Sequence, residues 1–107
     1  MKALVLEDDD LFSELLETVV AGLRPGMRVT VASRLSEAFR FVDDDDFDLI
    51  IADWNLPDGS GLELVRRVRS AKATMPVVIV SARADRDSVL KAAHYGINGY
   101  ITKPLDV

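Results

Sequence analysis

One stretch, residues 48–61, constrains the fold of this chain more than any other. It contains a continuous apolar run at 49–52, and such runs are typical of a parallel strand whose two faces are both buried. Asp53 follows at the carboxyl end of the run and leads into a turn with Pro57 and Gly59. In open α/β sheets, ligands bind in the crevice beyond these strand ends. Asp53 is therefore either a residue that ends a strand before a turn or a carboxylate placed to do chemistry.

The length and composition limit what such a site can belong to. At 107 residues, the chain is large enough for one domain with a single core. It has no cysteine, which excludes disulfides and thiolate metal sites, and no apolar run of the roughly 18 residues that a membrane span needs. The net charge of −5 argues against sequence-independent binding to DNA phosphates. We expect a soluble, cytoplasmic domain that binds neither membranes nor nucleic acid directly.

The rest of the chain alternates strand and helix signals. The other predicted strands are 2–6, 29–32, 77–80 and 99–102, and a segment with helical apolar spacing follows each of the first four strands. Each crossover between parallel strands must be right-handed, so this alternation predicts a doubly wound parallel five-stranded sheet of the α/β class with helices on both faces.

Local signals place the ends of the helices. Asp9 or Asp10 can cap the first helix, whose apolar residues continue to Leu23 before Pro25 and Gly26 end it. The remaining signals are the capping box of Ser60 and Glu63 at the third helix, Asp85 at the start of the fourth, and Gly96 after its end. On the third helix we expect Arg66, Arg67 and Arg69 to face solvent.

Polar residues fall where the predicted strands end. Glu7 and Asp8 follow the first strand, Asp53 the third, Ser81 the fourth and Lys103 the fifth. Parallel strands bring these ends to one edge, where three carboxylates repel one another and suit a cation with oxygen ligands, such as Mg²⁺. Lys103 and the Ser81 hydroxyl are suited to hold phosphoryl oxygens. An Asp can accept a phosphoryl group covalently, so the pattern points to phosphoryl transfer.

These motifs, in this order, resemble the receiver domain of bacterial response regulators. The matching segments are 6–8, 53–61, 81–83 and 99–104, and together they cover residues 2–104. The resemblance implies a flavodoxin-like sheet in the order 2-1-3-4-5. It also implies a signalling domain rather than an enzyme, one that catalyses at most its own phosphorylation and dephosphorylation. Asp53 would take a phosphoryl group from the phosphohistidine of a sensor histidine kinase or a histidine phosphotransfer protein, and a conformational switch would control an output.

The resemblance also implies a role for each site residue. Glu7, Asp8, Asp53 and the backbone carbonyl of Asn55 would ligate Mg²⁺, with Glu7 able to act through a metal-bound water. Lys103 would bind phosphoryl oxygens.

Four further expectations concern the surroundings of that site. Ser81 would also bind phosphoryl oxygens, and Tyr100 would report the state by rotating inward with Ser81. Arg83 and Asn55 flank the phosphoryl position and would tune how fast water removes the group. The Lys103–Pro104 bond would be cis.

Some of these residues have simpler interpretations. Glu7 and Asp8 could cap a helix, Ser81 could be a turn residue, and Tyr100 could be a packed aromatic. We interpret the acidic run 43–46 as a solvated loop, because it lacks the spacing of a calcium loop. His94 lies near a helix end, where a cation complements the dipole, and Trp54 is expected to be partly exposed at the rim of the site.

Two other functions fit parts of the pattern. A haloacid-dehalogenase-type phosphatase also uses a strand-end Asp, but it needs a second Asp two residues on, where this chain has Asn55. A protein-binding module could keep the fold without being phosphorylated, although the intact acceptor, acidic pair and Lys103 argue against it.

Receiver domains usually carry a fifth helix after the Lys-Pro pair, whereas this sequence ends three residues beyond Pro104. We therefore expect that helix, and an output domain, in a longer protein. Without the helix, the sheet face beside the first helix would be half bare, exposing Ile101 or Tyr100 and favouring a homodimer.

Overall fold

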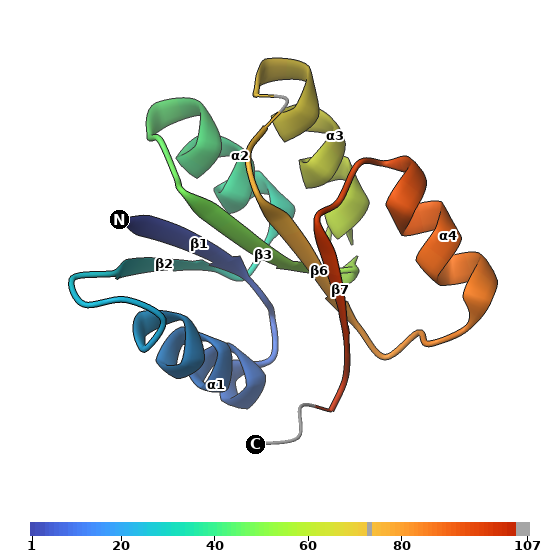
Figure 1. Cartoon of the computed structure of the whole chain (residues 1–107), viewed down its shortest axis with the longest axis horizontal. Coiled ribbons are helices and arrows are strands. Elements are labelled where there is room, and N and C mark those ends of the chain that lie inside the picture. The colour runs from blue at the N-terminus through green and yellow to red at the C-terminus, as the bar shows by residue number, and fades with distance from the viewer. Residues whose placement is uncertain (73, 105–107) are drawn as a thin grey trace.

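The computed structural model describes residues 1–72 and 74–104 and contains a parallel five-stranded sheet between two layers of helices (Figure 1). The sheet has the order β2-β1-β3-β6-β7, which confirms the predicted doubly wound fold and its 2-1-3-4-5 strand order. Its strands are β1 (Lys2–Leu6), β2 (Arg28–Ala32), β3 (Leu49–Asp53), β6 (Val77–Ser81) and β7 (Gly99–Thr102). A two-stranded hairpin, β4 (Asn55–Leu56) with β5 (Gly59–Ser60), lies in the turn after β3 and was not predicted.

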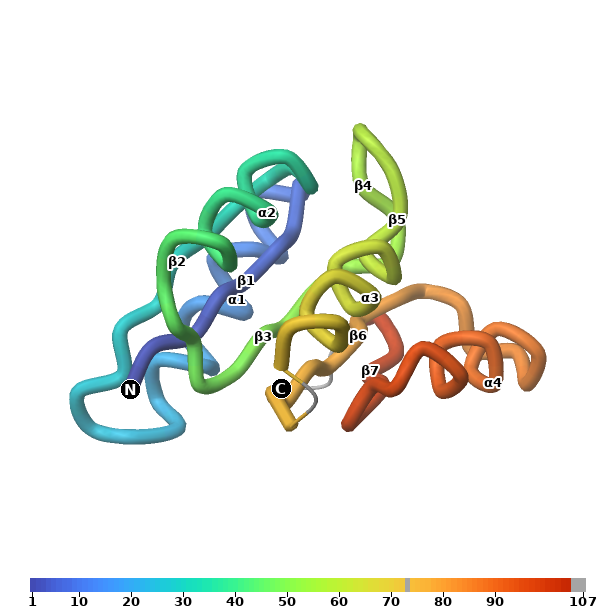
Figure 2. The backbone as a smooth tube through the Cα atoms, turned by 90° about the horizontal axis from the view of Figure 1, so that it is seen from above, coloured from blue at the N-terminus to red at the C-terminus, as the bar shows by residue number. Residues whose placement is uncertain are grey.

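The helices divide unequally between the two faces of the sheet. They are α1 (Asp10–Ala21), α2 (Leu35–Asp44), α3 (Gly61–Ala71) and α4 (Arg86–His94). In the described part of the chain, α1 covers one face, and α2, α3 and α4 cover the other (Figures 1 and 2). No helix within residues 1–72 and 74–104 is long and apolar enough to cross a membrane.

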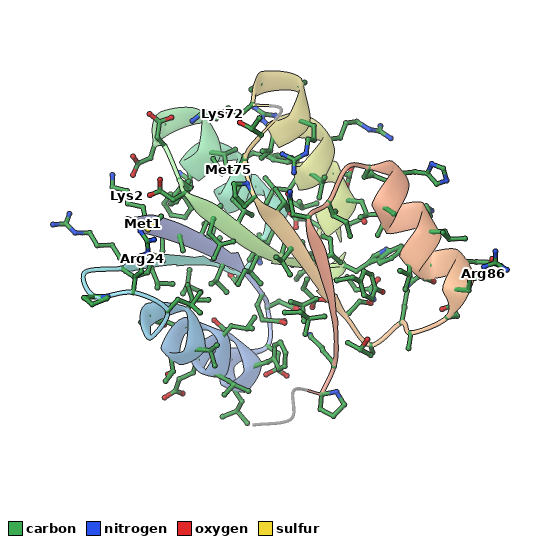
Figure 3. The ribbon with its side chains drawn as sticks, in the orientation of Figure 1. Met1, Lys2, Arg24, Lys72, Met75 and Arg86 are labelled. Carbon is green, nitrogen blue, oxygen red and sulfur yellow. The ribbon has the colours of Figure 1, made fainter. Side chains whose placement is uncertain are left out.

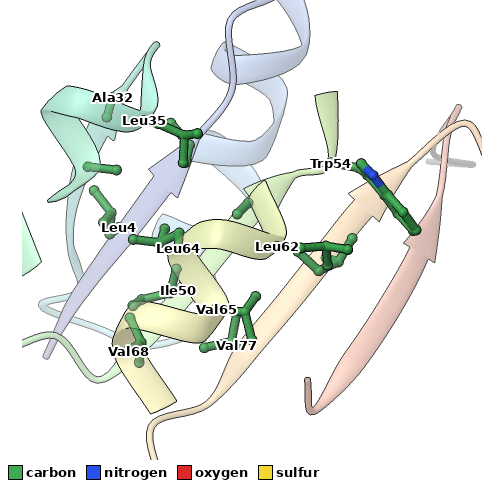
Figure 4. Close-up of a cluster of buried hydrophobic side chains, with 14 of the residues drawn as sticks. Leu4, Ala32, Leu35, Ile50, Trp54, Leu62, Leu64, Val65, Val68 and Val77 are labelled. Carbon is green, nitrogen blue, oxygen red and sulfur yellow. The ribbon is translucent and has the colours of Figure 1, made fainter. Parts of the chain in front are cut away.

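Two hydrophobic clusters hold these layers together. On the α1 side, Leu16 and Val20 pack against Val5 and Ile51. The larger cluster joins the opposite sheet face to the other three helices, with Leu64 of α3 at its centre (Figure 4). Because both faces of the inner strands are buried, their sequences are continuous apolar runs rather than alternating ones, as predicted.

The predicted helix caps are present. Asp9 accepts a hydrogen bond from the Phe12 N–H (2.8 Å), and Asp85 accepts one from the Ser88 N–H (3.0 Å). Ser60 and Glu63 form the reciprocal capping box, and Gly96 follows α4 with a φ of 89°.

The predicted end of α1 was wrong. The helix stops at Ala21, with Gly22 as its C-cap, and does not continue to the Pro25–Gly26 pair. Leu23 is 58% exposed and takes no part in the core. Glycine is a weak helix former; the Gly22 N–H bonds to the Thr18 carbonyl, and the Leu23 N–H bonds to the Val20 carbonyl in a tightened last turn.

The three arginines of α3 do not all face solvent freely. Arg69 is half-buried and donates hydrogen bonds to the Gly96 carbonyl and to the Asn98 side chain, each 2.7 Å long. Arg66 and Arg67 are exposed, as expected, and they stack on Tyr95 and Phe39. The prediction was wrong for Arg69 because its partner is a backbone carbonyl just beyond the C-terminal end of α4, which has no partner within the helix. The helical period of α3 carries no information about that carbonyl.

The acidic run 43–46 is exposed, although its first two residues belong to the end of α2. Asp43 pairs with Arg67 (2.5 Å) and Asp45 with Lys2 (2.8 Å), while Asp46 pairs with Lys72. Lys2 and Lys72 are both seen at the end of the molecule where β1 begins (Figure 3). Surface cations therefore pair with three of the four acids of the run.

The last strand places its aromatic and aliphatic residues on opposite faces. Ile101 packs with the cluster under α1 and is half-buried, whereas Tyr100 packs with the cluster under the other three helices. The expectation that Tyr100 lies on the face beside α1 is wrong, because neighbouring strand residues point to opposite faces.

Candidate functional site

Four strand ends bring charged and hydroxyl side chains to one edge of the sheet, as the sequence predicts. Glu7, Asp8 and Asp53 each offer a carboxylate oxygen, and these oxygens lie within 4.8 Å of one another. The Lys103 ammonium lies 2.7 Å from Glu7 Oε1 and 3.0 Å from Asp53 Oδ2. Ser81 ends the neighbouring strand β6, and its carbonyl accepts a hydrogen bond from the Lys103 N–H.

The site is largely removed from water. Glu7 is 1% exposed and Asp53 is 6% exposed, whereas Asp8 faces solvent. Burial disfavours the charged form of Lys103, but its hydrogen bonds to Glu7 and Asp53 outweigh burial and raise the pKa of Lys103 above its ordinary value. The Phe12 ring centroid lies 4.4 Å from the ammonium, a cation–π contact that the sequence pattern does not indicate.

The arrangement fits a divalent cation. Glu7 and Asp53 are buried and share a single ammonium, so one buried negative charge stays uncompensated, and buried charges are stable only when they are paired. The exposed Asp8 adds a further negative charge. Carboxylate oxygens, with the exposed Asp8 open to water, form the donor set that hard cations such as Mg²⁺ prefer. Glu7, Asp8 and Asp53 could therefore hold a metal ion together.

The helix-capping interpretation does not account for Asp8. The residue whose side chain caps α1 is Asp9, and the Glu7 Oε2 accepts the Asp9 N–H at 3.1 Å. Asp8 thus has no capping bond within the described residues. This leaves it free to contribute to the acidic cluster.

Arg83 links the acceptor loop to the loop after β6. Its N–H donates to the Ser81 hydroxyl (3.0 Å), and its guanidinium donates to Asn55 Oδ1 (3.3 Å). The Tyr100 hydroxyl donates to the Arg83 carbonyl at 2.5 Å. Arg83 therefore contacts the side chains of Ser81, Asn55 and Tyr100. The sequence predicted the position of Arg83 beside the site but not these three hydrogen bonds.

Comparison with known proteins decides the family. Residues 3–107 match the response regulator receiver domain family. The chain belongs to this family. It is thus a phosphoacceptor signalling domain of the two-component type.

Individual relatives agree with this assignment. The receiver domain is 40% identical to a glycerol metabolism activator of Pseudomonas putida over 103 residues, which cover 95% of this chain and 47% of that protein. It is 33% identical to the chemotaxis protein CheY of Pseudomonas aeruginosa, covering 97% of this chain and 85% of the relative. The BeF3-activated receiver domain of DrrB, from Thermotoga maritima, is 27% identical with a TM-score of 0.89, covering 98% of this chain and 86% of that one. The chain therefore spans about half the length of the first of these relatives.

Trp54 was predicted at the rim of the site, and this was wrong. In the receiver domain its indole is only 4% exposed and belongs to the larger hydrophobic cluster (Figure 4). The Arg83 guanidinium lies 4.7 Å from the ring, and the Tyr100 ring meets it edge-on at 6.4 Å. The indole is covered by Tyr100 of strand β7 and by Arg83 of the loop after β6, which the local sequence cannot reveal.

The start of α3 approaches the acceptor so closely that only glycine fits. The Gly61 N–H donates to the Trp54 carbonyl at 2.8 Å, and a Cβ at Gly61 would overlap the Asp53 carbonyl oxygen. We expect Gly61→Ala to destabilise the receiver domain by about 2 kcal/mol or more, because the overlap involves backbone that cannot move freely. Urea unfolding measures this loss.

Gly22→Ala is the matched control. A Cβ at Gly22 would meet no atom closer than 3.5 Å, so this variant should be at least as stable as the wild type. Equal stability of the two variants would show that the close approach at Gly61 is unimportant.

One well-formed cavity of the receiver domain lies away from this edge of the sheet. A hollow of about 390 Å³ opens between the ends of α2 and α3 and is lined by Phe47, Val68 and Met75, among others. The arginine at its edge, Arg67, is already paired with Asp43. The cavity is lined by none of the strand-end residues, so we assign phosphoryl transfer to the acidic cluster instead.

Proposed function

We propose that Asp53 is the phosphoacceptor of this receiver domain and that it receives the phosphoryl group from a phosphohistidine. The observation that carries the proposal is the buried contact of the Lys103 ammonium with both Asp53 and Glu7, at 3.0 and 2.7 Å. It aims a cation at the carboxylate that would react. Glu7 shares the burial and the lysine contact, but its Oε2 also accepts the Asp9 N–H, whereas Asp53 ends the central strand β3 of the sheet.

The cation is proposed to be Mg²⁺, held by Glu7, Asp8, Asp53 and the backbone carbonyl of Asn55. When bound, it would neutralise charge on the phosphoryl oxygens. A carboxylate oxygen of Asp53 attacks the phosphorus, and the P–N bond breaks with its electron pair going to the imidazole. The product is an acyl phosphate on Asp53.

Lys103 and Ser81 would hold the transferred group. The ammonium already contacts Asp53, so it can bind the phosphoryl oxygens of the modified residue without a large movement. The Ser81 hydroxyl now accepts the Arg83 N–H and can donate its own proton to a phosphoryl oxygen.

Tyr100 is the proposed reporter of this state. Its hydroxyl is bonded to the Arg83 carbonyl, and the Arg83 N–H is bonded to Ser81, so movement of Ser81 toward a phosphoryl group would disturb the Tyr100 contact. The DrrB receiver domain exists in a BeF3-activated state, which supports a switch of this kind here. The packed-aromatic interpretation would leave the Tyr100 ring in place after phosphorylation.

The proposed partners follow from the family. A sensor histidine kinase or a histidine phosphotransfer protein would donate the phosphoryl group in the cytoplasm, and an output domain in the same protein would read the switch. The relative from Pseudomonas putida is about twice as long as the matched region and is a metabolism activator, which supports control of an output. Homodimer formation beside α1 and the absence of direct DNA contact stay predictions for this domain.

Acetyl phosphate with Mg²⁺ separates this function from its two rivals. A phosphoacceptor gives a lasting adduct, a phosphatase gives continuous release of phosphate, and a binding module gives neither. The structure favours the first over a phosphatase, because the Asn55 side chain is an amide bonded to Arg83 and cannot serve as a general acid. Steady phosphate release without an adduct would refute the phosphoacceptor function.

Arg83 should set the lifetime of the acyl phosphate. Its guanidinium contacts Asn55 and the Trp54 ring, which follow Asp53 directly in the chain, and from this position we expect it to limit the approach of water to the acyl phosphate. We expect Arg83→Ala to shorten the lifetime of the adduct roughly threefold, equal to about 0.7 kcal/mol of barrier. Arg86→Ala, which removes an exposed charge from the nearby α4, is the control and should decay like the wild type (Figure 3). A longer lifetime in Arg83→Ala would contradict the shielding role.

A further inference from the structure

Helix α2 is capped by a residue from another part of the chain. Its own N-cap residue, Arg34, makes no side-chain cap. The Asp58 carboxylate, 23 residues beyond Leu35, accepts the Leu35 N–H at 2.8 Å and the Ser36 N–H at 3.1 Å. The bond from Leu35 contributes most to holding the pKa of Asp58 below its ordinary value. A single exposed carboxylate thus satisfies two open N–H groups of the helix.

The same residue belongs to the hairpin that follows the acceptor. Asp58 lies in the turn between β4 and β5, and Asn55, at the start of β4, pairs with Ser60 across the hairpin. Ser60 is bound to α3 through the capping box with Glu63. The hairpin is therefore attached to α3 on one side, while the hydrogen bonds of Asp58 attach it to α2 on the other.

Close packing supports this attachment. A Cβ at Gly59 would overlap both the Leu35 side chain of α2 and the Glu63 carboxylate of α3. The hairpin is thus seated between the N-termini of the two helices. Asn55 is exposed, and its N–H makes only a long bond of 3.4 Å to Asp53 Oδ1. Its other contacts are the pairing with Ser60 across the hairpin and the Arg83 guanidinium, so its position depends on where the hairpin is held.

We propose that Asp58 is a positioning residue for the divalent-cation site, because its bonds to α2 hold the hairpin that carries Asn55. The inference rests on the proposed function, in which the Asn55 carbonyl is one of the cation ligands. Asp58 itself is not part of the acidic cluster and would not touch the ion. Its contribution is preorganisation: a ligand loop that is already ordered loses less conformational entropy on binding.

The coupling must act in both directions. If attachment of the hairpin to α2 raises the affinity for the cation, then binding of the cation must strengthen that attachment. The Leu35 and Ser36 amides, which lie on α2 and far from any proposed ligand in sequence, should exchange hydrogen more slowly when Mg²⁺ is bound.

Calorimetric titration with MgCl₂ tests the proposal. We expect Asp58→Ala to weaken Mg²⁺ binding about tenfold, as is usual for residues that orient metal ligands from outside the coordination sphere. The variant should also melt at a lower temperature, because α2 loses its cap.

A second variant separates positioning from helix stability and from charge. Arg34→Ser combined with Asp58→Ala gives α2 a cap of its own at the N-cap position and keeps the net charge of the wild type. We expect this double variant to regain thermal stability, while its Mg²⁺ affinity stays about tenfold lower than that of the wild type. Arg34→Ser alone should bind Mg²⁺ like the wild type.

The outcomes are distinguishable. Wild-type affinity in Asp58→Ala, or recovery of both stability and affinity in the double variant, would overturn the role of Asp58 and leave the proposed function intact. Failure of the wild type to bind Mg²⁺ would overturn the proposed metal site and this inference together. Slower exchange of the Leu35 and Ser36 amides on adding Mg²⁺ supports the coupling, and unchanged exchange contradicts it.

Discussion

Asp53→Asn is expected to abolish phosphorylation while leaving the fold intact. The amide has nearly the same shape as the carboxylate, but it is a poor nucleophile. The amide oxygen can still accept the hydrogen bond from Lys103. Because the amide is neutral, the substitution also removes one negative charge from a cluster of three carboxylates. The apo variant should therefore be at least as stable as the wild type.

Mass spectrometry after acetyl phosphate treatment measures this result. The wild type should gain about 80 Da, the mass of a phosphoryl group, and lose it at alkaline pH, as acyl phosphates do. Asp53→Asn should gain nothing. Asp48→Asn, which changes an exposed acid at the far end of the same strand, is the matched control and should be phosphorylated normally. An adduct that persists in Asp53→Asn would place the acceptor elsewhere.

Millimolar Mg²⁺ is expected to raise the melting temperature of the wild type and to have little effect on Asp8→Ala. A ligand that binds only the native state adds about 2.7 kcal/mol at a hundredfold excess over its dissociation constant. For a domain of this size, that corresponds to a shift of roughly 10–20 °C. Asp8 is exposed and forms no helix cap, so Asp8→Ala removes a proposed ligand without removing a structural contact.

Asp10→Ala controls for loss of negative charge near the site. Asp10 is also exposed and lies two residues away, but it is outside the acidic cluster. The variant should keep the full Mg²⁺ shift. An unchanged midpoint in the wild type, or an equal shift in Asp8→Ala, would refute the proposed metal ligands.

Much of the fold could be predicted because its determinants are local. The apolar runs of β1, β3 and β6 reflect burial on both faces, and the caps Asp9, Ser60 and Asp85 act within three residues of their helix starts. The meeting of Glu7, Asp53 and Lys103 also followed from strand order, since parallel strands end at one edge.

The residues that were missed depend on contacts between distant segments. The cap of α2 comes from Asp58, and the ends of α3 and α4 are joined by Arg69, both over more than 20 residues. Trp54 is buried because Arg83, from the loop after β6, and Tyr100, from strand β7, cover it. Helical periods and local signals carry no information about such pairs, so the supporting contacts of the site become visible only in three dimensions.

The most direct test of the account is to map the phosphorylated residue. After incubation with acetyl phosphate and Mg²⁺, borohydride reduces an aspartyl phosphate to homoserine, and peptide sequencing by mass spectrometry locates the change. We predict homoserine at position 53 in the wild type and at no other acidic position. Modification at another aspartate, or no modification while Mg²⁺ binds, would contradict the assignment of Asp53 as the phosphoacceptor.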